Sequence, residues 1–325
     1  MSSSNLSGLV ISLDFELLWG VADSKDERYY DNITAVRDII PRLIDLFERF
    51  EVGVTWATVG AVCCANLEDF VSSCPKWPHD GTSEAALNPL GNYETLLNTP
   101  ENLLFAPELV EMIALAPLQE LGCHSFGHIY ACAEDVSASQ FGSDVAAAVL
   151  RLKRPKQQIS SFVFPRNQVN PEYLSILEQH GFSAFRGNTD HWAYAFSSNR
   201  LQSYGSRIFR FVDSYLPLSG SRSVSPEIVT DSLVDVPASC FFRPYKKQLS
   251  ILEPLKIRRI KWSMKRAARS GRLFHLWWHP HNFGAHAQEN LCQLEEILTY
   301  FSLLRQEYNF ESLTMEKVSG RVLGK

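Results

Sequence analysis

Short apolar runs alternate with a segment of helical periodicity over the first sixty residues. Residues 9–13 form a β-branched apolar run that predicts a buried strand. Residues 33–50 carry apolar side chains at helical spacing, and residues 52–58 form a second apolar run. A strand, a helix and another strand in this order favour parallel pairing, so the pattern predicts an α/β fold.

The same alternation returns after residue 106 and continues into the C-terminal part of the chain. Pro171 suits the first turn of a helix, and Gly181 suits its end. The predicted elements are a helix at 107–116, strands at 119–123, 159–164 and 184–186, a helix at 171–179, a strand at 272–278 and a helix at 288–308.

Two regions interrupt the alternation, at about 65–106 and 187–250. The first is rich in proline and polar turn residues, and the second contains one predicted strand, at 207–212. The sequence has no internal repeat and no segment with the composition of an interdomain linker. We therefore predict a single domain over residues 1–325, an α/β barrel decorated by two loop-rich insertions.

Polar side chains that can do chemistry follow the predicted strands. The carboxyl ends of parallel strands form the ligand-binding edge of α/β barrels and of open α/β sheets. Residues placed there by chance would not favour strand ends so consistently, so this placement indicates a shared site. The candidates are Asp14, Glu16, His124, His128, Arg166 and His279.

The segment Gly122–His128 places two histidines four residues apart at a strand end. A helical turn there would put both imidazoles on one side. With a carboxylate from Glu16 or Asp14, two neutral imidazoles supply three metal ligands and leave a position open for water. We expect a divalent metal, zinc in the first place, although iron, cobalt and nickel accept the same donors.

The remaining polar residues complete a hydrolytic site. The carboxylate that does not bind the metal can act as general base toward water, and Arg166 can pair with it and keep it charged. Alternation along residues 272–281 places three histidines on one side of the strand. Of these, His279 is the expected acid, His281 is the alternative, and His275 is expected to be structural. Together these roles describe metal-assisted hydrolysis of an amide.

Four of these segments resemble, in the same order, motifs of the polysaccharide deacetylases (carbohydrate esterase family 4, the NodB-like homology domain). The resemblance covers about residues 8–320, and its most specific part is the His-Ser-x-x-His motif at His124–His128. The nearest candidate for a further family motif is Asp190–Trp192. The matching segments are Ser12–Glu16 for the strand ending in Asp-Asp, His124–His128, Phe164–Asn167 for the Arg-Pro-rich strand end and Leu276–Pro280 for Leu-x-His.

The resemblance implies a distorted (β/α)7 barrel and removal of an acetyl or formyl group from the nitrogen of an amino sugar. By the same resemblance Asp14 would be the base, Arg166 would steer it, and His279 would be the acid. The metal ligands that it implies are Glu16, His124 and His128.

This sequence departs from the family motif at the carboxylate ligand. The family's usual ligand is an aspartate directly after the base, and Phe15 stands at that position. Strand alternation places Glu16 on the same side as Asp14 and directs Phe15 away. Glu16 is therefore the expected ligand, and Asp14 remains the alternative.

Net charge, the N-terminal pattern and the cysteine content narrow the expected location and substrate of the protein. A net charge of −5 argues against general nucleic-acid binding. The N-terminal residues lack the pattern of a signal peptide, and seven cysteines without a CxxC pair argue against a disulfide framework. We expect a cytoplasmic enzyme that acts on a nucleotide-linked or lipid-linked amino sugar, a precursor of surface polysaccharide or lipopolysaccharide. A metal-independent allantoinase-like hydrolase and a non-catalytic carbohydrate-binding barrel are the alternatives.

A basic run at 255–272 contains no acidic residue. Such a run is usually a solvated helix face. Leu255, Ile260, Trp262 and Met264 interleave with the basic residues, so the segment could also form an amphipathic surface. Such a surface would contact the inner face of an anionic membrane peripherally, or a phosphate-linked sugar.

Overall fold

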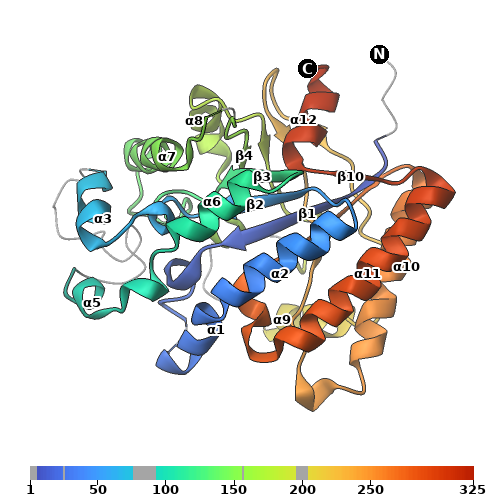
Figure 1. Ribbon diagram of the computed structural model, residues 1–325. Coiled ribbons are helices and arrows are strands. Elements are labelled where there is room, and N and C mark those ends of the chain that lie inside the picture. Colours follow the sequence, from blue (N-terminus) through green and yellow to red (C-terminus); the bar gives the residue numbers. More distant parts are fainter. Residues whose placement is uncertain (1–5, 25, 76–92, 156, 195–203) are drawn as a thin grey trace.

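The computed structural model describes residues 6–24, 26–75, 93–155, 157–194 and 204–325 (Figure 1). Its strands belong to one sheet that takes segments from most of the length of the chain. They are β1 (Gly8–Phe15), β2 (Val54–Thr58), β3 (Gln119–Cys123), β4 (Ser161–Phe162), β5 (Ala184–Phe185), β6 (Glu227–Ile228), β7 (Val234–Asp235), β8 (Cys240–Phe241), β9 (Leu273–Trp278) and β10 (Glu311–Leu313).

The sheet curls around β1, which pairs with β2 and β10 on one side and with β9 on the other. The strand order is β6-β7-β5-β4-β3-β2-β1-β9-β8, and within the described residues only the β6–β7 pair is antiparallel. The sheet closes because β7, which lies next to one end of this order, and β8, at its other end, belong to one segment, 234–242. Val236 donates its N–H to the carbonyl of Phe185 in β5, and Phe242 donates its N–H to the carbonyl of Trp277 in β9. The segment thus joins the two edges of the sheet into a barrel.

Helices cover the outside of this barrel. In Figure 1, α6, α2, α11 and α10 lie side by side, and each contacts the next. Their apolar faces pack on the outward side chains of the strands. The helices are α1 (Tyr30–Thr34), α2 (Val36–Arg49), α3 (Leu67–Ser73), α5 (Tyr93–Asn98), α6 (Pro107–Leu115), α7 (Ala138–Leu152), α8 (Leu174–Gln179), α9 (Tyr204–Asp213), α10 (Glu253–Ser270), α11 (Ala287–Tyr308) and α12 (Met315–Leu323).

A second, smaller core fills the amino-terminal end of the barrel interior. Helix α12 closes this end, and the backbone N–H of Met315 donates to Thr55 Oγ1 at 2.9 Å. Because strand side chains alternate, polar side chains of the strands also point into the barrel, nearer the carboxyl-terminal ends of the strands. The apolar members of this core include Val10, Ala57, Ala184, Val234 and Leu273 from strands and Met315 and Val318 from α12.

Most predicted elements are present, and two regions differ from the prediction. The strand predicted at 207–212 is wrong, because these residues lie within α9. The region expected to form loops at 65–106 contains α3 and α5, while 76–92 lie outside the described residues. Helices α7 and α12 and the short strands β6, β7, β8 and β10 are additions.

The basic run of residues 255–272 lies mainly in α10, which packs against α11 and β9. Ile260 and Met264, which could have faced lipid, are buried in the core. The lipid-facing surface expected from the sequence is therefore incomplete, and only Leu255 and Trp262 of that set are exposed. Within the described ranges, no helix combines the length and the hydropathy that a membrane span requires.

Candidate active site

The two carboxylates at the end of β1 point toward the same histidine. Asp14 lies within β1, and Glu16 follows it as the residue before the 3-10 helix η1 (Leu17–Gly20). His279 Nε2 lies 3.7 Å from Asp14 Oδ2 and 3.5 Å from Glu16 Oε1. Both carboxylates are almost fully buried, whereas the His279 side chain is 22% exposed and gives the site its contact with solvent.

A loop, rather than the expected helical turn, brings His124 and His128 together. Ser125 and His128 adopt left-handed backbone angles, with φ of 62° and 60°, so the chain reverses within four residues. Asp144 of α7 holds this loop by accepting the backbone N–H groups of Phe126, at 2.7 Å, and Gly127, at 2.9 Å. The two imidazole rings end 5.1 Å apart.

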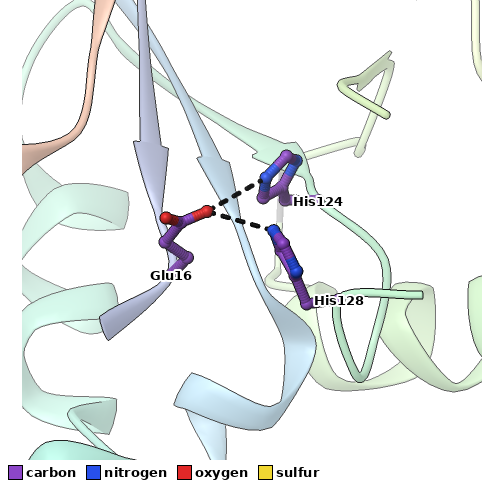
Figure 2. Close-up of side chains that lie close together, drawn as sticks. All are labelled: Glu16, His124 and His128. Atoms are coloured by element: carbon purple, nitrogen blue, oxygen red, sulfur yellow. Dashed lines mark ion pairs between the residues drawn. The ribbon is translucent and has the colours of Figure 1, made fainter. Parts of the chain in front are cut away.

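Both of these imidazoles face one oxygen of Glu16 (Figure 2). Glu16 Oε2 lies 3.4 Å from His124 Nε2 and 3.2 Å from His128 Nε2. His124 Nδ1 lies 2.7 Å from the carbonyl oxygen of Val163, which accepts its proton and leaves a lone pair on Nε2. That Nε2 atom is buried and has no hydrogen-bond partner among the described residues.

The other oxygen of Glu16 faces a second pair of histidines. His281 Nε2 lies 3.3 Å from Oε1, and His279 lies slightly farther away. His281 is fully engaged, because its Nδ1 contacts the hydroxyl of Tyr29 at 2.9 Å. Gly20 allows this crowding, since a Cβ there would lie 1.9 Å from the carboxyl carbon of Glu16. Burial alone raises the pKa of Glu16, but the surrounding histidines hold it well below its usual value.

Asp14 has a different environment, dominated by Arg186. The buried guanidinium of Arg186 donates to both oxygens of Asp14 at 2.7 Å, and it also donates to Ser12 Oγ and Asn167 Oδ1 at 2.9 Å. Burial raises the pKa of Asp14, but the charge and hydrogen bonds of Arg186, together with His124 and His279, outweigh this effect and lower the pKa below its usual value. Asp14 is therefore an oriented, ionised carboxylate.

The predicted pairing of Arg166 with this carboxylate is wrong. Arg166 has a left-handed φ of 56°, pairs with Asp23 and lies over the ring of Tyr130. Arg186 occupies the position expected for Arg166. Arg186 ends the short strand predicted at 184–186, so it carries the same sequence signal as the other candidates.

The described residues contain two groups that could hold a metal ion, and they share Glu16. One group adds His124 and His128, and the other adds His279 and His281. The first group fits a metal better, because His124 presents a buried, unpartnered lone pair that an ion would satisfy. Asp14 fits a metal less well, since Arg186 occupies both of its oxygens.

Comparison with solved structures shows the same fold over nearly the whole chain. A protein described as a polysaccharide deacetylase from Mycobacterium smegmatis has a TM-score of 0.60 at 13% identity, with 100% of this chain and 93% of that chain covered. A polysaccharide deacetylase, so described, from Pseudomonas aeruginosa PAO1 has a TM-score of 0.57 at 11% identity, with 97% and 90% covered. Puue allantoinase has a TM-score of 0.56 at 10% identity, with 98% and 91% covered.

No protein-family model and no curated protein matched the sequence. At these identities the structural similarity concerns the fold. The barrel is of the polysaccharide deacetylase type, which confirms the predicted fold class.

Proposed function

We propose that this protein is a metal-dependent hydrolase that removes an N-acyl group, acetyl or formyl, from an amino sugar. One observation carries the proposal. Two buried imidazoles converge on one oxygen of Glu16, next to a separate carboxylate, Asp14, that is held ionised by Arg186. A ligand set beside an independent base is the arrangement that metal-assisted amide hydrolysis requires.

In this proposal Glu16, His124 and His128 hold the divalent ion. When bound, the ion would polarise the amide carbonyl and lower the pKa of a coordinated water molecule. Zinc suits two imidazoles and one carboxylate with an open position. Val163 supports the set by fixing the tautomer of His124.

The residues around this set divide the proton transfers between them. Asp14 accepts a proton from the attacking water, whose oxygen forms a bond to the acyl carbon. Arg186 orients Asp14 and keeps it charged. His279, the partly exposed histidine, donates a proton to the nitrogen as the C–N bond breaks, so that a carboxylic acid and a free amine leave. His281 suits this role less, because it is buried and contacts Tyr29.

We place the amino sugar in a precursor of surface polysaccharide or lipopolysaccharide. The fold of the barrel, which it shares with proteins described as polysaccharide deacetylases, supports a carbohydrate substrate. Hydrolysis of the acyl group would expose an amine and change the charge of the sugar at neutral pH, which is a modification that later steps of glycan assembly can recognise.

The direct test is release of acetate or formate from N-acyl amino sugars by the purified protein. We expect release that stops after thorough chelation and returns with added Zn²⁺, while Asp14→Asn stays inactive with metal present. A metal-loaded protein that releases neither acid from any such sugar contradicts the proposal.

The same experiment separates the other functions compatible with this fold. Puue allantoinase shares the barrel, so a cyclic or small amide belongs among the substrates tested. Turnover that survives complete chelation would favour a metal-independent amide hydrolase. Affinity for a glycan without turnover, unchanged in Asp14→Asn, would favour a carbohydrate-binding barrel.

A further inference from the structure

A cavity of about 440 Å³ lies next to the candidate active site. Asn167, Trp277 and Phe241 line it, and each contacts Arg186 or His279. Asn167 accepts a hydrogen bond from Arg186, whose guanidinium lies 4.4 Å from the ring of Trp277. The ring of Phe241 lies 6.0 Å from that of His279. The cavity therefore begins one side chain away from the predicted base and acid.

Positive charge dominates the wall of this cavity. None of the described residues that line it is acidic. The lining arginines are Arg166, Arg207, Arg210, Arg222 and Arg243. Volume and polarity suit a small charged ligand, because sites for such molecules measure roughly 300–1,000 Å³.

The arginines differ in their partners. Arg166 pairs with Asp23, and Arg222 lies 3.5 Å from Asp213, so these two charges are compensated within the protein. In the described part of the chain, neither Arg207 nor Arg243 forms an ion pair with an acidic residue.

Like charges crowd one another at this wall. Burial, together with the charges of Arg243 and Arg207, lowers the pKa of Arg210 from its usual value. A cluster of guanidinium groups in mutual repulsion is stabilised by an anion, and the planar fork of arginine matches the oxygens of phosphate.

Aromatic side chains form the part of the cavity nearest the active site. The rings of Trp277 and Phe241 lie 4.8 Å apart. An apolar sugar face can pack on such rings, while a charged group beyond it reaches the arginines. The cavity thus offers an apolar part beside the reaction centre and a cationic part farther away.

We propose that this cavity binds the diphosphate of an activated amino sugar, with the N-acyl group directed at Asp14 and Glu16. The inference rests on the proposed function, whose substrate class it specifies. A sugar nucleotide and a polyprenyl-diphosphate-linked sugar share this chemistry. A neutral glycan chain does not, since it has no anion for Arg207 and Arg243.

The test is calorimetric titration of the metal-loaded full-length protein with inorganic pyrophosphate, UDP and farnesyl diphosphate. Replacing both Arg207 and Arg243 by glutamine should raise the Kd of each diphosphate that binds by about 30-fold or more. Arg207→Gln alone, at an exposed position, should give a smaller increase of the same sign. Tighter binding of UDP than of farnesyl diphosphate would identify a nucleotide-linked substrate, and the reverse order a lipid-linked one.

The control is the double variant Arg266→Gln and Arg269→Gln, which removes two positive charges from α10 outside this cavity. Its Kd values should match those of the wild type. No binding of any of the three diphosphates, or equal binding by both double variants, overturns the inference.

Acetate or formate release separates this inference from the proposed function. Hydrolysis of neutral N-acyl sugars without any arginine-dependent diphosphate binding would leave the proposed function standing and remove the inference. Arginine-dependent binding of a diphosphate without hydrolysis of any N-acyl sugar would leave the diphosphate site standing and remove the proposed hydrolase function.

Discussion

Two buried glutamates, Glu16 and Glu120, lie at opposite ends of the barrel and have opposite electrostatic surroundings. Their exposed fractions are 2% and 3%. Glu16 is surrounded by imidazoles near the carboxyl ends of the strands. Glu120, near the start of β3, accepts hydrogen bonds from the hydroxyl of Thr55 and the backbone N–H of Glu316, at 2.7 and 3.2 Å.

The pKa values of the two groups move in opposite directions. Burial raises the pKa of Glu120 to about 7, since its neutral hydrogen-bond donors do not offset the loss of hydration. The histidines around Glu16 outweigh the same penalty and lower its pKa. Burial of a carboxylate therefore does not by itself mark the chemical centre of this barrel. The imidazoles around Glu16 distinguish that centre from the equally buried Glu120.

Removal of one imidazole from Glu16 should have the largest effect. We expect His124→Ala to lose bound metal and more than about 10³-fold of activity, because it removes one of three ligands. His281→Ala should retain metal if the ion lies between Glu16, His124 and His128. Elemental analysis of both variants, with His180→Ala in α8's C-terminal turn as the control, measures this. Metal retained by His124→Ala and lost by His281→Ala would assign the ion to the other pair.

Neutralising Asp14 should separate the base from the metal site. We expect Asp14→Asn to keep its metal but lose about 10²–10⁴-fold in kcat, the usual contribution of a general base. Arg186 would then lack its anion, so the melting temperature should fall as well. Metal content, kcat and thermal melting are measured on the same preparation. Loss of metal together with activity would instead make Asp14 a ligand.

The sequence identified the predicted histidine ligands more readily than the arginine that orients Asp14. His124 and His128 are recognisable because their spacing is local. Arg166 follows one predicted strand and Arg186 ends another, so the sequence did not distinguish them. The left-handed φ of Arg166 turns its side chain out of the strand alternation, whereas Arg186 continues β5 and donates its backbone N–H to Phe162.

The secondary structure likewise contains elements that the sequence predicts and elements that it does not. Long periodic segments such as β1, β9 and α11 were predicted within a few residues. The segment 234–242, which joins the sheet edges, contains only the two-residue strands β7 and β8, too short for any alternation. Its conformation depends on pairing with β5 and β9, which lie far away in the sequence. Helix α9 was mistaken for a strand because its apolar residues cluster within six positions.

A methyl group at Gly20 should disturb the position of Glu16 without replacing any ligand. Because the new Cβ would overlap the Glu16 carboxylate, we expect Gly20→Ala to weaken metal affinity by about 10–100-fold, as loss of a supporting contact does. The matched control is Gly142→Ala in α7, where the nearest atom, on Ile176, lies at an acceptable 3.6 Å. Competition with a fluorescent chelator gives both affinities. Equal affinities would mean that Glu16 moves freely or does not bind the ion.

The smallest effect concerns Glu120 and is on stability alone. Between about pH 4.5 and 7 the folded protein keeps a proton on Glu120 that the unfolded chain has lost, so its contribution to stability falls as the pH rises. Above pH 7 the buried charge is a constant cost. Glu120→Gln removes that cost, and we expect it to raise the free energy of unfolding by about 1–3 kcal/mol at pH 8 and hardly at pH 5.

Urea denaturation at both pH values measures this change in the free energy of unfolding, with Glu307→Gln on the exposed face of α11 as the control. Activity should remain unchanged, because Glu120 lies at the end of the barrel that α12 closes. Equal stabilities of the wild type and Glu120→Gln at pH 8 would show that the protein already stabilises the charge of Glu120.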